Sequence, residues 1–266
     1  MAYVRYEHHG EISVGWRRDA MLFPLDAASV GDLRPGSTHP EHGRSVPAAD
    51  VRLLPPVTDR SRIIGVGMNY YDALPVGAAA PAYPVFFTKF VSCLVGAFDP
   101  IETPSESVAV DAEGELAIVI GRRGRRIPEK NALDYVLGCT VANDVTVRDF
   151  QSMSTQWLQG KAWDSTTPLG PSIVPYESLP VDARIRTTID GVLVQDGCID
   201  QMIFSVPKLI SLISTFMTLE VGDVILTGTP AGNGHNRTPR QYLTEGQTVE
   251  VSIDGVGSVR NVVTAG

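Results

Sequence analysis

The sequence predicts an α+β protein dominated by β-structure, and three observations lead to this prediction. Short apolar runs rich in β-branched residues recur along most of the chain. Many of these runs have glycine or proline near their ends, which is the pattern of strands joined by turns. Clear helical periodicity is confined to two segments, and these do not alternate regularly with the strand-like runs. The pattern therefore favours an α+β domain over a doubly wound parallel sheet.

The first part of the chain is predicted to form a separate unit. Ile12 and Val14 lie in a short strand-like run, and residues 34–47 are polar and rich in proline, glycine and histidine. Such a composition is typical of a loop or linker. We therefore expect residues 1–55 to form a small β-rich domain with a linker, and residues 56–266 to form the main domain.

Strand-like runs dominate the main domain. The clearest helical pattern covers residues 206–218, which have one apolar face, and a second covers residues 130–136. The predicted strands are residues 63–67, 116–120, 185–189, 224–226, 248–253 and 259–263.

Charge and composition exclude several classes of function. The chain of 266 residues carries a net charge of −8 and has no basic stripe with interleaved aromatic residues, which argues against nucleic-acid binding. No run approaches the roughly 18 apolar residues of a membrane span, and the start lacks the apolar core of a signal peptide. Three scattered cysteines without a CxxC pair are typical of reduced thiols. We expect a cytoplasmic protein that binds a small molecule and no membrane.

Three acidic side chains alternate along one segment. Asp111, Glu113 and Glu115 share one face if residues 110–115 are extended throughout. Neighbours about 7 Å apart would repel one another by about 2.5 kcal/mol at an effective dielectric of about 20. The apolar run that follows indicates entry into a core, where a hard cation such as Mg²⁺, Mn²⁺ or Ca²⁺ would neutralise the carboxylates. The alternative is an exposed strand face with hydrated carboxylates.

Other polar residues add to this predicted site, each with an alternative. Asp144 ends an apolar stretch, either as a third metal ligand or as the N-cap of the next turn. The loop at Gly228 and Thr229 offers backbone N–H groups to a carboxylate or oxyanion, unless it is an ordinary turn. Lys161 stands among apolar and aromatic residues, where it is a substrate clamp, a general acid with a lowered pKa, or a surface lysine.

These elements, taken in order, resemble the fumarylacetoacetate hydrolase (FAH) family from about residue 63 to the end of the chain. The nearer subgroup contains the mammalian FAH-domain proteins and bacterial relatives, some of which tautomerise or decarboxylate oxaloacetate. The motifs that carry the resemblance are Val66-Gly67-Met68-Asn69-Tyr70, Phe87-Thr88-Lys89-Phe90, Glu113-Gly114-Glu115-Leu116, residues 143–149, Gly160-Lys161, residues 168–171, residues 222–230 and residues 243–249.

The resemblance implies a mixed β-roll catalytic domain in residues 56–266, a homodimer, and Mg²⁺ or Mn²⁺ as cofactor. It assigns the metal ligands to Glu113, Glu115 and Asp144, and it makes Lys161 a catalytic residue near the metal. The substrate-binding positions that it implies are Tyr70, Arg148, Gln151, Gly228 and Thr229. The implied substrate is a 2-oxo acid or a β-dicarbonyl compound, which reacts through a metal-stabilised enolate.

The sequence departs from the family pattern at one position. Hydrolytic members carry Asn-Tyr-x-x-His and a nearby glutamate, and this pair activates water. Here Ala73 occupies the histidine position, and the nearby glutamate is absent. Candidate replacements for the missing base are His235, Asp72 and Lys161.

Three functions fit these features. The leading hypothesis is a metal-dependent enzyme that forms an enolate from a 2-oxo acid or β-dicarbonyl compound, by tautomerisation, decarboxylation or related C–C chemistry. The second is an acylpyruvate or fumarylacetoacetate-type C–C hydrolase that uses a non-standard base. The third is a non-catalytic protein that binds a metal and an oxo acid. The loss of the water-activating pair favours the first.

Overall fold

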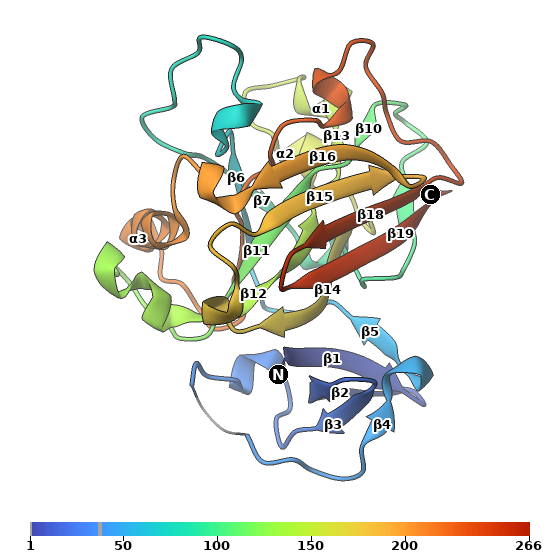
Figure 1. Cartoon of the computed structure of the whole chain (residues 1–266), viewed down its shortest axis with the longest axis vertical. Helices are drawn as coiled ribbons and strands as arrows, with labels where there is room; N and C mark the ends of the chain where they lie inside the picture. Colours follow the sequence, from blue (N-terminus) through green and yellow to red (C-terminus); the bar gives the residue numbers. More distant parts are fainter. Residues whose placement is uncertain (1, 37–38) are drawn as a thin grey trace.

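The protein is built mainly from strands, as predicted, and its computed structural model describes residues 2–36 and 39–266. The N-terminal strands lie together at one end of the molecule, and the C-terminal strands cross the larger body (Figure 1). No helix among the described residues is long and apolar enough to cross a membrane. The α-helices of the described part are α1 (Arg148–Gln151), α2 (Leu158–Lys161) and α3 (Val206–Phe216).

The largest sheet runs from the N-terminal strands into the main body. Its strands follow the order β4-β3-β2-β1-β14-β12-β11-β17-β6-β7, with β5 paired to β1 and β8 paired to β14. The sheet is mixed, because β17 is parallel to β6 whereas β11 is antiparallel to β12. Its members in the main body are β6 (Ile63–Gly67), β7 (Val85–Lys89), β8 (Leu94–Val95), β11 (Gly114–Ile120), β12 (Val136–Asn143), β14 (Thr167–Val174) and β17 (Val224–Leu226).

Strands β11 and β12 form the buried centre of this sheet. Every residue of both strands is buried, which explains why their sequences are continuously apolar instead of alternating. Their register pairs Gly114 with Asn143. Glu113 directly precedes β11 and Asp144 directly follows β12, so this register brings the two acidic residues to the same end of the strand pair.

A second sheet packs against the first across the main core. Its strand order is β16-β15-β18-β19-β9. The largest cluster of buried side chains includes Ile118 and Cys139 from the first sheet and Ile185 and Val251 from the second. The strands are β9 (Ile101–Thr103), β15 (Arg184–Ile189), β16 (Val192–Cys198), β18 (Thr248–Ile253) and β19 (Gly257–Ala265), and a separate two-stranded ribbon joins β10 (Val110–Asp111) and β13 (Thr146–Val147).

The N-terminal strands have a small core of their own and also a link to the main body. Val4, Tyr6, Leu22 and Leu53 form a local cluster. Strand β1 joins the large sheet where Tyr3 pairs with Ile173 of β14. Within the linker predicted at residues 34–47, residues 37 and 38 lie outside the described part. The strands are β1 (Ala2–His8), β2 (Glu11–Arg18), β3 (Met21–Pro24), β4 (Val46–Pro47) and β5 (Arg52–Leu54).

The two predicted helices have different outcomes. Helix α3 confirms the helix expected at residues 206–218, although it ends at Phe216; it buries Leu209 and Ile213 and has a proline in its first turn. The second segment forms a 3-10 helix, Glu129–Tyr135, followed at once by β12. It connects a proline to a buried strand, and 3-10 turns are frequent in such connectors.

The continuous strand expected over residues 110–115 is interrupted, and this prediction was wrong. Asp111 ends β10, whereas β11 starts at Gly114, and the two strands belong to different sheets. The break is stabilised by Glu113, whose backbone N–H donates to the Asn143 side chain at 3.0 Å. Asp111 is thereby separated from the other two carboxylates and binds Arg148 instead.

The packing of α3 gives a direct test of the core. Leu209 has no exposed surface, whereas Leu133 in the neighbouring 3-10 helix is 43% exposed. We expect Leu209→Ala to lower the free energy of unfolding by about 2–5 kcal/mol, because it leaves a cavity in a close-packed core. Leu133→Ala is the matched control and should cost less than about 1 kcal/mol. Urea denaturation of both variants measures the difference, and equal losses would contradict the burial assigned to α3.

Candidate metal centre and active site

Three carboxylates converge at the shared end of β11 and β12. Glu113, Glu115 and Asp144 are all buried, and one ligand oxygen from each lies within 4.8 Å of the others. Glu115 also accepts a hydrogen bond from the backbone N–H of Gly228 at 2.8 Å. The structure thus brings together the three metal ligands that the resemblance implies, at the shared end of two paired strands.

Two buried lysines bind these carboxylates from opposite sides. Lys161, at the end of α2, donates to Glu113 and to Asp144 at 2.5 Å each. Lys89, at the end of β7, contacts the other oxygen of Asp144 at 2.8 Å and donates to the carbonyl of Val145 at 2.9 Å. Asp144 is therefore held between two ammonium groups, which fix the direction of its carboxylate.

Arg148 and Asp111 form a third buried ion pair beside the carboxylates. Arg148, at the start of α1, donates to Asp111 at 2.7 and 2.9 Å and to Glu113 at 2.5 Å. Asp111 in turn accepts hydrogen bonds from the backbone N–H groups of Gly234 and His235 at 2.8 and 3.0 Å. This pair joins α1 to the loop that follows β17, and it leaves Arg148 largely neutralised by protein carboxylates.

The balance of buried charge makes the cluster suitable for a cation. Four carboxylates face three cationic side chains, so one negative charge is in excess when all seven are ionised. Among the described residues, Glu115 is the carboxylate of this cluster without a lysine or arginine partner. The carboxylates are Asp111, Glu113, Glu115 and Asp144, and the cations are Lys89, Arg148 and Lys161.

The pKa shifts follow this arrangement. Burial raises the pKa of Glu113, but the charges of Arg148 and Lys161 outweigh burial and hold it at about 2. Burial raises the pKa of Glu115 well above its usual value, and the charge of Asp144 adds to this effect. Burial would lower the pKa of Lys161, but Asp144 and Glu113 outweigh burial and raise it. The lowered pKa that the sequence suggested for Lys161 is therefore wrong, because its pKa is raised.

An oxygen-only donor set fits a hard divalent cation. Carboxylates are the protein groups that Mg²⁺ and Mn²⁺ prefer, and a divalent ion would reverse the excess negative charge of the cluster. Glu113, Glu115 and Asp144 are the residues that would hold it.

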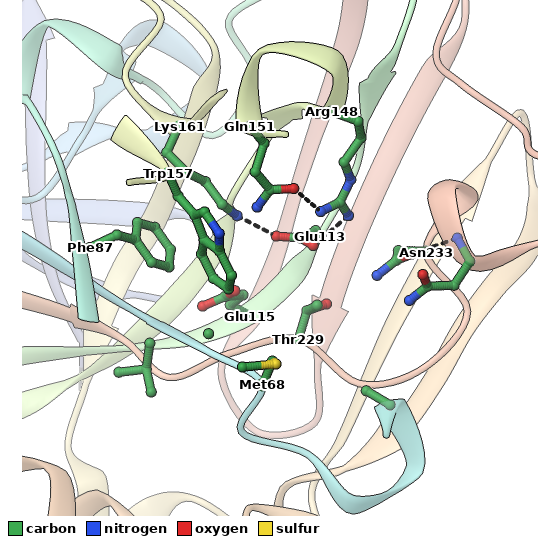
Figure 2. A pocket seen from close by; sticks show the side chains of 14 residues that line it. Met68, Phe87, Glu113, Glu115, Arg148, Gln151, Trp157, Lys161, Thr229 and Asn233 are labelled. Carbon is green, nitrogen blue, oxygen red and sulfur yellow. Dashed lines mark hydrogen bonds and ion pairs between the residues drawn. The ribbon is translucent and has the colours of Figure 1, made fainter. Parts of the chain in front are cut away.

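A cavity of about 190 Å³ opens above the carboxylates. Figure 2 shows Phe87 and Trp157 on one side of it and Asn233 on the other, with Lys161, Gln151 and Arg148 along one edge. The Lys161 ammonium lies 4.7 Å from the centre of the Phe87 ring. The lining side chains are Val66, Met68, Ala73, Phe87, Glu113, Glu115, Arg148, Gln151, Trp157, Lys161, Thr229, Asn233 and Asn236.

Several predicted site residues lie at or beyond the edge of this cavity. Thr229 lines it, but its hydroxyl already donates to the carbonyl of Gly114 and accepts from Gln195. Tyr70 is fully buried in the main core, and Gly228 contributes its backbone N–H to Glu115. Neither of these two belongs to the lining, so their contribution to the site is to support it.

The two side chains proposed as alternative bases also lie outside the lining. Asp72 accepts a hydrogen bond from the backbone of Ala231 at 3.3 Å on the surface. The Nδ1 atom of His235 is 3.0 Å from the Tyr242 hydroxyl. Burial, together with Arg148, lowers the pKa of His235. Ala73, by contrast, does line the cavity.

Some residues of the site were missed or misassigned from the sequence. Lys89 belongs to a matching motif but received no role, although a lysine that ends an apolar strand-like run is itself a signal of a buried cation. Asp111 was grouped with the metal-facing carboxylates. Trp157 and Asn233 lie in irregular segments, where no periodicity indicates which way a side chain points.

Comparison with known proteins assigns the family. The model for the C-terminal domain of fumarylacetoacetate hydrolase matches residues 62–264, and an N-terminal family model described as Rv2993c-like matches residues 1–56. The chain belongs to the fumarylacetoacetate hydrolase family.

Several relatives are named as tautomerases or isomerases. The mitochondrial oxaloacetate tautomerase fahd2 of Xenopus laevis is 44% identical over 81% of this chain and 69% of its own length. The oxaloacetate tautomerase YisK of Bacillus subtilis is 40% identical over 81% of this chain and 74% of its own. Among solved structures, a 5-carboxymethyl-2-hydroxymuconate delta-isomerase from Mycobacterium smegmatis matches with a TM-score of 0.88 and 34% identity, covering 100% of both chains.

The buried lysine on β7 provides a test of the charge balance. We expect Lys89→Met to lower the free energy of unfolding by about 3–5 kcal/mol in EDTA, because it removes one partner of a buried ion pair. A divalent cation held by Asp144 would compensate part of this loss, so the difference from the unchanged protein should shrink in Mn²⁺.

Lys208→Met is the matched control for this variant. Lys208 pairs with Glu129 at 3.5 Å on the surface, and such pairs contribute about 0–1 kcal/mol. Chemical denaturation with and without Mn²⁺ measures both variants. A loss for Lys89→Met that is as small as the control would show that Lys89 does not balance the cluster.

Proposed function

We propose that the protein is a divalent-metal-dependent tautomerase of a 2-oxo acid, with oxaloacetate as the substrate to test first. The observation that carries this proposal is a cavity that combines three converging carboxylates and a buried lysine with an alanine where a water-activating histidine would stand. The relatives named as oxaloacetate tautomerases support the same reaction.

Glu113, Glu115 and Asp144 would hold Mg²⁺ or Mn²⁺ at the floor of the cavity. Such an ion, when bound, acts as a Lewis acid toward the adjacent carboxylate and keto oxygens of a 2-oxo acid and favours the enolate. The Gln151 amide lies along the same edge of the cavity as Lys161 and donates a hydrogen bond to a substrate oxygen (Figure 2).

Lys161 carries the proton in the proposed reaction. Its nitrogen donates to the carboxylates of Glu113 and Asp144, so it enters the reaction as an ammonium. In the enol-to-keto direction the enol hydroxyl loses its proton to solvent as the substrate binds. The ammonium of Lys161 then gives a proton to C3, forming the C–H bond, and recovers a proton from solvent. The Phe87 and Trp157 rings shield this side of the cavity from bulk water.

The same cavity argues against the hydrolase alternative. C–C hydrolysis needs a base that activates water, and Ala73 cannot accept a proton. His235 and Asp72 lie outside the lining. The two lining carboxylates, Glu113 and Glu115, are both proposed metal ligands. Tautomerisation requires no activated water and therefore fits the residues present.

The metal requirement is tested with Glu115→Gln. Losing one ligand should lower the metal-dependent tautomerisation of oxaloacetate at least about hundredfold, since Lewis-acid stabilisation is worth several kcal/mol. The loss of enol absorbance in Mg²⁺ or Mn²⁺ measures the rate, and EDTA should abolish the activity of the unchanged protein. Glu245→Gln, at an exposed position, is the control and should keep full activity. Full activity of Glu115→Gln after EDTA treatment would exclude the metal mechanism.

The absence of a water-activating base is tested with Ala73→His. General-base catalysis typically contributes about 10²–10⁴-fold, so a histidine without its glutamate should raise acylpyruvate hydrolysis by at least about tenfold. Label incorporated from ¹⁸O water into the new carboxylate, followed by mass spectrometry, detects hydrolysis specifically. Ala78→His, on an exposed loop, is the control. Hydrolysis by the unchanged protein at the rate of Ala73→His would favour the hydrolase alternative.

The non-catalytic alternative predicts a different pair of results. A protein that only binds an oxo acid would give a calorimetric binding signal for oxaloacetate with Mg²⁺ and no acceleration of its tautomerisation. Lys161, held between two carboxylates and facing the cavity, favours a catalytic role over simple binding.

A further inference from the structure

The wall of the cavity opposite Phe87 and Trp157 carries side-chain amides that the proposed reaction does not use. Asn233 caps the short 3-10 helix Gly234–Asn236 and Asn236 is its last residue, and both line the cavity. Figure 2 shows Asn233 across the cavity from Lys161, with its side chain directed inward. Asn233 is only 5% exposed, so its amide is a fixed part of the wall.

Hydrogen bonding fixes which end of the Asn233 amide faces the cavity. Its Oδ1 atom accepts from the backbone N–H of Asn236 at 3.2 Å. A flipped amide would set two donors against each other, so the NH₂ group must point toward the ligand. Gln151 behaves in the same way, because its Oε1 atom accepts from Arg148 at 3.1 Å and its NH₂ group has no hydrogen-bond partner among the described residues. Both amides therefore present donors.

The cavity thus offers hydrogen-bond donors at both ends. Lys161 and Gln151 lie near the carboxylates, and Asn233 lies on the far wall. Trp157, Phe87 and Met68 supply an apolar side. A ligand that matches this wall carries acceptors at its two ends and no donor toward Asn233. The far end lies beside Asn236, which is exposed, so a charged group there keeps part of its hydration.

We propose that Asn233 is a specificity-determining residue, and that its amide NH₂ group binds the second carboxylate of a dicarboxylic 2-oxo acid. The first carboxylate and the keto oxygen occupy the end of the cavity near Glu113, Glu115 and Lys161. The chemistry assigned to the end near Glu113 and Lys161 rests on the proposed function. The inward direction of the Asn233 NH₂ group does not depend on that function. A monocarboxylic 2-oxo acid leaves the Asn233 donor without a partner, which disfavours its binding.

Asn233→Asp is the variant that isolates this role. An aspartate keeps an oxygen for the N–H of Asn236 and so preserves the turn, but it replaces the inward donor with a negatively charged acceptor. Asn233→Ala removes the donor without adding charge. Two probes separate the ends of the cavity: oxaloacetate, which has a second carboxylate beyond the reacting carbon, and oxalate, which chelates a metal through adjacent oxygens and has no far end.

Calorimetry in Mn²⁺ measures the Kd of each probe, and the enol assay adds KM and kcat for oxaloacetate. We expect the Kd and KM for oxaloacetate to rise about fivefold in Asn233→Ala and at least a further tenfold in Asn233→Asp. The Kd for oxalate should stay within about threefold in both variants, and kcat should change less than KM. This pattern separates a contact with the far carboxylate from a general loss of structure.

Two results would overturn the proposal. The first is an equal rise in Kd for oxalate and oxaloacetate, which would mean that Asn233 only supports the loop. The second is an unchanged oxaloacetate Kd in Asn233→Asp, or no oxaloacetate binding to the unchanged protein. A protein that binds oxaloacetate through Asn233 but does not speed its tautomerisation would refute the proposed function and leave the subsite standing.

Discussion

The organisation of this protein depends on four carboxylates buried near one end of the β11–β12 strand pair, one more than the cationic side chains that face them. Burying a carboxylate costs free energy unless a cation or several hydrogen bonds compensate it. Three cationic side chains supply most of that compensation, and each arrives from a different element: Lys89 from β7, Arg148 from α1 and Lys161 from α2. The ion pairs therefore hold these elements around the strand ends, and the remaining negative charge defines where a divalent cation would bind.

The fold positions these groups through strand register and not through sequence proximity. Gly114 and Asn143 are paired, so Glu113 and Asp144 meet although they lie thirty-one positions apart. Asp111 lies two residues before Glu113 in the separate β10–β13 ribbon, and it fixes the loop after β17 by accepting hydrogen bonds from two backbone N–H groups. The same ribbon thus aligns Arg148 on one side of the cavity and Asn233 on the other. The β10–β13 ribbon therefore positions both Arg148, which balances the buried charge, and Asn233, which is proposed to recognise the substrate.

The sequence predicts the class of fold and the three carboxylates that converge, but not the full site. Continuous apolar runs identified β11 and β17, because strands buried on both faces cannot alternate. The carboxylates at 113, 115 and 144 lie next to such runs, where acidic residues need compensation, but it is the resemblance to the FAH family that implies them as a ligand set. The break at Ala112 could not be foreseen, since it depends on a hydrogen bond from Glu113 to Asn143, a tertiary contact. Trp157 and Asn233 escaped detection for the same reason: loops carry no periodicity that indicates side-chain direction.

The central claim is that Glu113, Glu115 and Asp144 hold one divalent cation. A crystal structure of the protein grown with Mn²⁺, with anomalous diffraction data collected at the manganese edge, tests it most directly. The account predicts one strong anomalous peak in contact with carboxylate oxygens of all three residues. The absence of a peak there, or a peak bound only by surface carboxylates, would contradict it.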